Sequence, residues 1–182
     1  CGYLGWGGHG EKEIMANLEK IRNWDYRPFF VTFAHHFWNH LCGHSESLSG
    51  IILKFADQSE GMDTGFTPLG RKVLERLLDN AEGKRILVDI KHMSPAARQE
   101  YYDLLDTGDA LYDDIPLIIS HGACNGLASH QDQTISFPNT GSKLNPVSIN
   151  FYDDEILRLV RSGGIIGLQM DERRLAHRET LK

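Results

Sequence analysis

Residues 85–92 read RILVDIKH, a run of apolar, largely β-branched residues that leads directly into a lysine and a histidine. Three further runs have the same character: PFFVTFA at 28–34, PLIIS at 116–120 and GIIGLQM at 164–170. Short runs of this composition are typical of β-strands, and nearly continuous apolarity is typical of strands that are covered on both faces. We therefore predict four buried strands in a parallel sheet.

Segments with a helical period separate these strands. They lie at residues 14–21, 67–78, 94–105 and 153–160. Thr67-Pro68 and Ser94-Pro95 are typical N-cap and first-turn pairs, and the acidic residues at 153–155 suit the positive end of a helix. The resulting order α-β-α-β-α-β-α-β requires a parallel sheet with right-handed crossovers.

Two architectures have this order: an open, doubly wound sheet and part of a (β/α)8 barrel. Long connections at roughly residues 36–66 and 122–150 follow strands rather than precede them, and in barrels such connections form the active face. We expect a partial (β/α)8 TIM-like barrel of about four consecutive parallel β/α units. Residues 1–182 would form a single domain.

Charge and composition exclude several classes of partner. Asp and Glu (25) outnumber Lys and Arg (19), and the formal net charge of −6 argues against a nucleic acid or an anionic membrane surface as partner. No apolar run approaches the roughly 20 residues of a membrane-spanning helix. The three cysteines show no CxxC spacing, so we expect neither a disulfide framework nor a zinc finger, and we favour a reducing, cytoplasmic compartment.

Histidines follow three consecutive predicted strands at their carboxyl ends. These histidines are His35, His92 and His121. The carboxyl ends of parallel strands share one rim of the sheet, where α/β enzymes place their ligands, and neutral imidazole is a good ligand for zinc. A single strand-end histidine is more often an ordinary hydrogen-bonded residue than a ligand, whereas three in register favour a metal site.

Other patterns of histidine, glycine and serine are weaker signals. His40 and His44 have the spacing of a zincin pair, but the LCG between them lacks the glutamate of HExxH, so we reject that site. The glycine-rich residues 5–10 follow no predicted strand, which disfavours a dinucleotide site. Ser120 and His121 are adjacent in a strand, where neighbouring side chains point to opposite faces, so we also disfavour a serine–histidine nucleophile pair.

Five segments of the chain form a familiar series. They read FVTFAH at 30–35, FTPLGR at 66–71, LVDIKHMS at 87–94, IISHGA at 118–123 and DDEILRLV at 153–160. In the same order they resemble segments of the membrane (renal) dipeptidase family, which belongs to the amidohydrolase-like metal-dependent hydrolases. The resemblance spans roughly residues 28–170, and its DxxH-x-S and SH-[GS]-A patterns are moderately specific.

This resemblance implies a (β/α)8 barrel with two zinc ions (Zn2+), bridged by a glutamate carboxylate and a water or hydroxide. By the same resemblance, His92 and His121 match the two histidines that ligate one of the metals. His35 matches the histidine that contacts the substrate and stabilises the tetrahedral intermediate. The implied reaction is hydrolysis of an amide, typically in a dipeptide, by a protein that forms homo-oligomers; one half of the zinc site is recognisable here.

The chain also departs from the family pattern. The family's first strand, with its His-x-Asp motif, has no counterpart, and its final Asp ligand would lie beyond Lys182. In the nearest match to the segment of the bridging glutamate, residues 6–9, Trp6 stands where the acid belongs, so the glutamate either lies upstream of Cys1, which we favour, or is lost. Ile149 stands in the place of the arginine with which the family's dipeptidases bind the substrate carboxylate. We therefore expect a central fragment of a longer hydrolase, inactive alone. The alternative is a non-catalytic binding or structural barrel domain that has lost the metal site.

Overall fold

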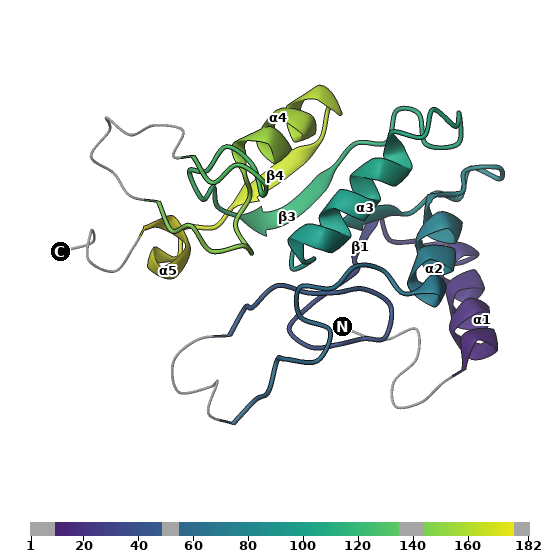
Figure 1. Cartoon of the computed structure of the whole chain (residues 1–182). Helices are drawn as coiled ribbons and strands as arrows, with labels where there is room; N and C mark the ends of the chain where they lie inside the picture. Colours follow the sequence, from purple (N-terminus) through teal and green to yellow (C-terminus); the bar gives the residue numbers. More distant parts are fainter. Residues whose placement is uncertain (1–9, 49–54, 135–143, 177–182) are drawn as a thin grey trace.

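Helices and strands alternate along the computed structural model, which describes residues 10–48, 55–134 and 144–176 (Figure 1). In chain order the elements are α1 (Glu11–Arg22), β1 (Phe30–Thr32), α2 (Pro68–Leu78), β2 (Leu87–Asp89), α3 (Pro95–Leu105), β3 (Ile118–Gly122), α4 (Asp153–Arg161), β4 (Ile165–Leu168) and α5 (Glu172–Leu175). The strands pair in the order β1-β2-β3-β4, and every pairing is parallel. The predicted α/β class with consecutive parallel β/α units is confirmed, here as a four-stranded sheet.

The strand register places the ends of neighbouring strands side by side. Thr32 of β1 lies opposite Asp89 of β2, and Asp89 lies opposite Ile118 of β3. In Figure 1 the connection that follows β3 gathers around the head of that strand's arrow, with α5 close by. The carboxyl ends of the strands are therefore overlaid by long connections, as the positions of those connections in the sequence predicted.

Thr67 and Ser94 begin the second and third helices as N-caps. Thr67 Oγ1 accepts a hydrogen bond from Gly70 N at 2.9 Å, and Ser94 Oγ accepts one from Ala97 N at 3.0 Å. Each cap satisfies an amide group that a helix leaves without a partner in its first turn, and a proline follows in both cases. Both helices therefore start where the sequence signals place them.

The apolar core lies between the sheet and its helices. The apolar stripe of α2 consists of Val73, Leu74, Leu77 and Leu78, each at most 1% exposed. β2 is buried at all of its positions, and β3 at most of them. These two central strands are the ones covered on both faces, as continuous apolarity predicts for a parallel sheet.

The two outer strands contradict the prediction that all four strands are buried. β1 is only partly buried, and Ile165 and Leu168 of β4 are 62% and 71% exposed. Both strands lie at the ends of the strand order, so no further strand of the described residues covers their outer edges. Val160 of α4 is also exposed, and α4 lies beside β4 at this end of the sheet (Figure 1).

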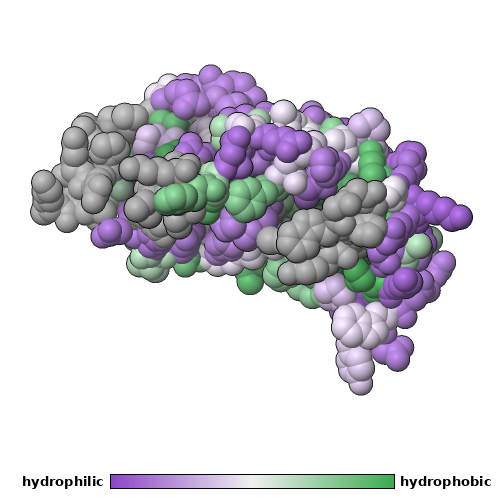
Figure 2. Space-filling view, turned by 90° about the horizontal axis from the view of Figure 1, so that it is seen from below, coloured by the Kyte–Doolittle hydropathy of each residue, from purple (hydrophilic) through white to green (hydrophobic). Residues whose placement is uncertain are grey.

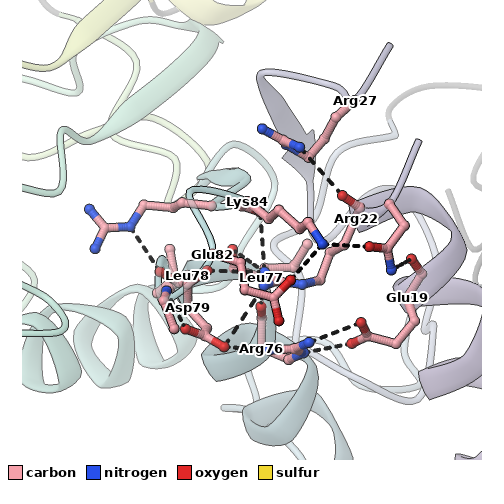
Figure 3. Close-up of polar contacts among 12 residues, drawn as sticks. Glu19, Arg22, Arg27, Arg76, Leu77, Leu78, Asp79, Glu82 and Lys84 are labelled. Atoms are coloured by element: carbon pink, nitrogen blue, oxygen red, sulfur yellow. Dashed lines mark hydrogen bonds and ion pairs between the residues drawn. The ribbon is translucent and has the colours of Figure 1, made fainter. Parts of the chain in front are cut away.

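A buried arginine joins α1 to the end of α2 (Figure 3). The Arg22 guanidinium is fully buried, and its Nη1 donates to the carbonyl oxygens of Asp79 and Lys84 at 3.1 and 3.2 Å and to that of Arg76. A cation here complements the unpaired carbonyl groups and partial negative charge of a helix C-terminus. Arg76 also forms an ion pair with Glu19 of α1 at 2.6 Å. These contacts hold α1 against α2.

The molecular surface mixes hydrophilic and hydrophobic residues. On the face shown in Figure 2, hydrophobic residues form small groups between hydrophilic ones. Scattered apolar side chains are ordinary on protein surfaces, so they do not mark a binding face there. Of the described helices, none is both long enough and apolar enough to cross a membrane.

Candidate metal centre

The structure brings the three strand-end histidines together. The ring centroids of His35 and His92 lie 4.5 Å apart, and those of His92 and His121 lie 5.2 Å apart. The histidines follow β1 and β2 and end β3, which are neighbours in a parallel sheet, so all three reach the same rim. His92 lies between the other two rings.

A fourth imidazole, that of His36, belongs to the same group. Its ring centroid lies 3.9 Å from that of His35 and 5.1 Å from that of His92. Sequence reasoning assigned no role to His36, although its place beside His35 just after a strand was a signal for it. We refer to His35, His36, His92 and His121 as the histidine cluster.

Asp89 joins three strand ends next to the cluster. Its fully buried carboxylate accepts hydrogen bonds from Thr32 Oγ1 at 2.8 Å, from Lys91 N at 3.0 Å and from Ser120 N at 2.9 Å. Hydrogen bonds to a charged group contribute about 1.5–3 kcal/mol each. Asp89 therefore fixes the chain segments that carry the histidines. An acid within an otherwise apolar run was the sequence signal for this role, and sequence reasoning missed it.

The backbone of His92 adopts a conformation that residues other than glycine rarely adopt. Its φ is +69°, in the left-handed region, at a cost on the order of 1 kcal/mol or more. Two hydrogen bonds hold the conformation: Lys91 N donates to Asp89 Oδ1 at 3.0 Å, and Ser45 N donates to His92 O at 2.9 Å. Backbone strain that neighbouring contacts maintain is a feature of functional sites.

Burial keeps the imidazoles of His92 and His35 neutral at pH 7. Burial, assisted by the charge of Lys91, lowers the pKa of His92 to about 2. Burial, assisted by His36, lowers the pKa of His35 to about 4. In both rings Nδ1 is buried and lacks a hydrogen-bond partner in the described part of the chain. A neutral imidazole with an unpaired nitrogen is the form that ligates a divalent metal.

Ser120 and His121 form a hydrogen-bonded pair, with Ser120 Oγ 2.9 Å from His121 Nδ1. The expectation that these side chains point to opposite faces is wrong, because β3 has a register shift between Ile119 and Gly122 that breaks the alternation. A hydrogen bond at Nδ1 orients the ring and leaves Nε2 for another partner, as is usual for metal-bound histidines.

The described residues do not contain a full set of metal ligands. Within residues 10–48, 55–134 and 144–176, no group of three or more His, Cys, Asp or Glu side chains could hold a metal ion. Metal binding by His92 and His121 therefore stays a prediction, as does the substrate contact of His35. Trp6, which the resemblance aligns with the bridging glutamate, lies outside the described residues.

A buried lysine lies beside Ile149, the residue that the resemblance aligns with the family's arginine. Lys91 is 1% exposed, and its Nζ donates to Ile149 O at 3.4 Å and lies 5.8 Å from the centre of the Phe151 ring. Burial lowers the pKa of this amine to about 7. The Lys91 amine, which can carry a positive charge, therefore lies next to Ile149. It comes from the end of β2, whereas Ile149 belongs to the connection after β3.

His40 and His44 lie in the connection after β1, and neither is on a helix. The ring nitrogens of the buried His44 lie 3.2 and 3.0 Å from the carbonyl oxygens of Ser45 and Glu60. These contacts give His44 a structural role within the connection. The rejection of a zincin pair agrees with this arrangement.

Comparisons of the chain with protein-family models, with curated proteins and with solved structures found no match. The similarity to membrane dipeptidases therefore rests on the sequence segments alone. The geometry of the histidine cluster is the structural observation that bears on function.

Proposed function

We propose that this chain belongs to a zinc-dependent hydrolase of amide or peptide bonds, built on a (β/α)8 barrel of the membrane dipeptidase type. One observation carries the proposal: three consecutive parallel strands deliver imidazoles to one rim, with successive ring centroids 4.5 and 5.2 Å apart. Barrel enzymes build their active sites at this rim. Parallel strands paired in sequence order are also the repeating unit of such a barrel.

The donors of the histidine cluster suit zinc. His92 has an Nδ1 without a hydrogen-bond partner in the described residues, and His121 uses Nδ1 to contact Ser120, which leaves Nε2 for a metal. Neutral imidazole nitrogen is a preferred zinc ligand. His92 and His121 would hold one ion, and we expect the remaining ligands of a two-zinc site to come from outside the described residues.

Bound zinc would lower the pKa of a water molecule and polarise the scissile carbonyl group. The residues of this chain would have separate parts in that chemistry. His35, beside His92, would donate a hydrogen bond to the carbonyl oxygen as negative charge develops there. Asp89 would hold the strand ends in place, so that the imidazoles need little reorganisation during the reaction.

The proposed substrate is a dipeptide or a similar small amide. Ile149 cannot bind a substrate carboxylate as an arginine would, because its side chain has no donor. Lys91 provides an amine at the same place, with its Nζ 3.4 Å from Ile149 O. An anionic end on the substrate is therefore compatible with the site.

We also propose that the protein is a homo-oligomer. Both ends of the sheet expose large apolar side chains: Phe29, next to β1, is 69% exposed, and Leu168 of β4 is 71% exposed. Unpaired sheet edges with apolar side chains favour association. Sedimentation of the purified protein tests this, and a monomer at all concentrations would contradict it.

Metal content and peptide hydrolysis together test the proposed enzyme. The full-length protein, purified with zinc, should hydrolyse dipeptides, and His92→Ala and His121→Ala should each lower its zinc content and abolish turnover. His130→Ala is the matched control, because His130 Nδ1 contacts Tyr152 Oη at 3.3 Å outside the cluster. A full-length wild-type protein that binds no zinc and hydrolyses no dipeptide would overturn the enzyme and favour a binding or structural barrel domain.

A further inference from the structure

The side-chain amide of Gln58 has one possible orientation next to the histidine cluster. Its Oε1 accepts hydrogen bonds from the backbone amides of Ser47 and Leu48 at 3.3 and 2.9 Å. Backbone amides only donate, so the oxygen faces them and the nitrogen faces the other partners. Those partners are Ser47 Oγ at 3.0 Å and the carbonyl oxygen of His36. Gln58 Nε2 therefore donates to both.

This orientation determines the hydrogen bond between Ser47 and His36. Ser47 Oγ accepts from Gln58 Nε2 and lies 2.6 Å from His36 Nδ1. Ser47 is 9% exposed, and no other acceptor in the described part of the chain contacts its hydroxyl hydrogen. A buried hydroxyl hydrogen without an acceptor is costly, so Ser47 donates to Nδ1. The hydrogen of the neutral imidazole then lies on Nε2.

The Nε2–H group of His36 is a donor without a hydrogen-bond partner in the described residues, in a ring 5.1 Å from that of His92. A ring nitrogen that carries a hydrogen has no lone pair for a metal, so His36 differs from the unpaired Nδ1 of His92. Its chemistry is donation to an electron-rich atom, such as a carbonyl oxygen that gains negative charge during hydrolysis.

We propose that His36 donates a hydrogen bond from Nε2–H to the carbonyl oxygen of the substrate, and that Ser47 and Gln58 are positioning residues that set its tautomer. The role in turnover rests on the proposed hydrolase function. The tautomer does not, because it follows from the hydrogen bonds of this chain alone. The two parts are therefore tested separately.

Nitrogen-15 NMR of the histidine rings at about pH 8, where an ordinary histidine is neutral, tests the tautomer. We expect the hydrogen of His36 on Nε2 in the wild type and in Ser47→Thr, which keeps the hydroxyl group. Ser47→Ala should give a mixture of both tautomers. A hydrogen on Nδ1 in the wild type, or an unchanged tautomer in Ser47→Ala, would overturn the assignment.

Steady-state kinetics and zinc content of the zinc-loaded protein test the donor. His36→Leu, which removes the donor, should lower kcat about 100-fold, because an oxyanion donor acts in the transition state, with KM within about threefold and zinc content unchanged. Ser47→Ala should lower kcat about tenfold, and Ser47→Thr should restore it. Full kcat in His36→Leu, or loss of zinc from it, would overturn the donor role. A wild-type protein without turnover would overturn the hydrolase function and the donor role, while the tautomer assignment would stand.

Discussion

The ion pair Arg98–Glu155 and the histidine cluster are both polar groups within the fold, but they differ in how completely their atoms are partnered. Every guanidinium nitrogen of Arg98 donates a hydrogen bond. Each carboxylate oxygen of Glu155 accepts one from Arg98 and a second from Tyr102 Oη or Tyr152 N. In the cluster, by contrast, buried ring nitrogens lack partners among the described residues.

This difference separates a structural network from a candidate site. The pair joins α3 to α4, and Glu155 also accepts from the amide that begins α4, so its contacts serve the fold. Buried polar atoms without partners cost free energy, and native proteins contain few of them. The strained backbone of His92 adds a second cost at the cluster. Unpartnered ring nitrogens and a strained backbone therefore distinguish the histidine cluster from the Arg98–Glu155 pair.

Arg98→Ala should produce the largest loss of stability. The substitution leaves the carboxylate of Glu155 buried without its cation, which costs about 3–5 kcal/mol. Urea unfolding measures the loss. The matched control is Arg158→Ala, which removes a half-exposed pair with Asp106 at the end of α3 and should cost less than about 1 kcal/mol. Equal losses in the two variants would contradict the contrast between saturated and exposed pairs.

Asp89→Ala should cost about 2–4 kcal/mol, since it removes an acceptor shared by three strand segments and leaves buried donors unpaired. Asp89→Asn keeps an oxygen for the amides of Lys91 and Ser120, and the Thr32 hydroxyl can accept from its nitrogen. The asparagine variant should therefore lose less. Denaturant unfolding of both variants checks this order, and equal losses would show that the hydrogen bonds of Asp89 do not hold the strand ends.

Acid should destabilise the protein through the cluster. The pKa of His92 is about 2 in the folded protein, whereas the ordinary value is 6.5. Between these two pH values the unfolded chain therefore binds a proton that the folded chain excludes. The stability contributed by neutral His92 is complete above pH 6.5 and falls with pH, by about 1–2 kcal/mol between about pH 7 and 5. His92→Asn, which does not titrate there, should show a flatter dependence. Identical slopes would refute the effect.

His92→Asn should have the smallest effect on stability at neutral pH. Asparagine tolerates a positive φ better than histidine, and the change removes a buried nitrogen without a partner in the described residues. We expect a free energy of unfolding within about 1 kcal/mol of the wild type, together with weaker zinc binding. A loss comparable to that of Arg98→Ala would mean that the cluster is a structural network.

Local signals determine the parts of the fold that the sequence predicts well. Thr67 and Ser94 cap helices through their own side chains, and each buried strand has its own apolar run, so no distant contact is needed to identify them. The exposure of residues 164–170 depends instead on whether another strand lies beside them. Apolarity alone carries no such information, and the prediction of four buried strands was wrong for this reason.

In the candidate site too, some features follow from sequence signals and others depend on contacts that the sequence does not reveal. The meeting of His35, His92 and His121 follows from strand order and parallel pairing, which the sequence predicts. The hydrogen bond between Ser120 and His121 depends on a bulge in β3 and could not be predicted from alternation. The tautomer of His36 and the contacts of Asp89 depend on hydrogen bonds between segments far apart in the chain, and these required coordinates.

Anomalous diffraction at the zinc edge, from crystals of the protein grown with zinc, tests the central claim most directly. We expect a zinc peak at about 2.0–2.1 Å from one ring nitrogen of His92 and one of His121. His36 should contact no metal in the same map. Absence of a peak at the cluster, or a peak held by His40 or His44 instead, would contradict the account.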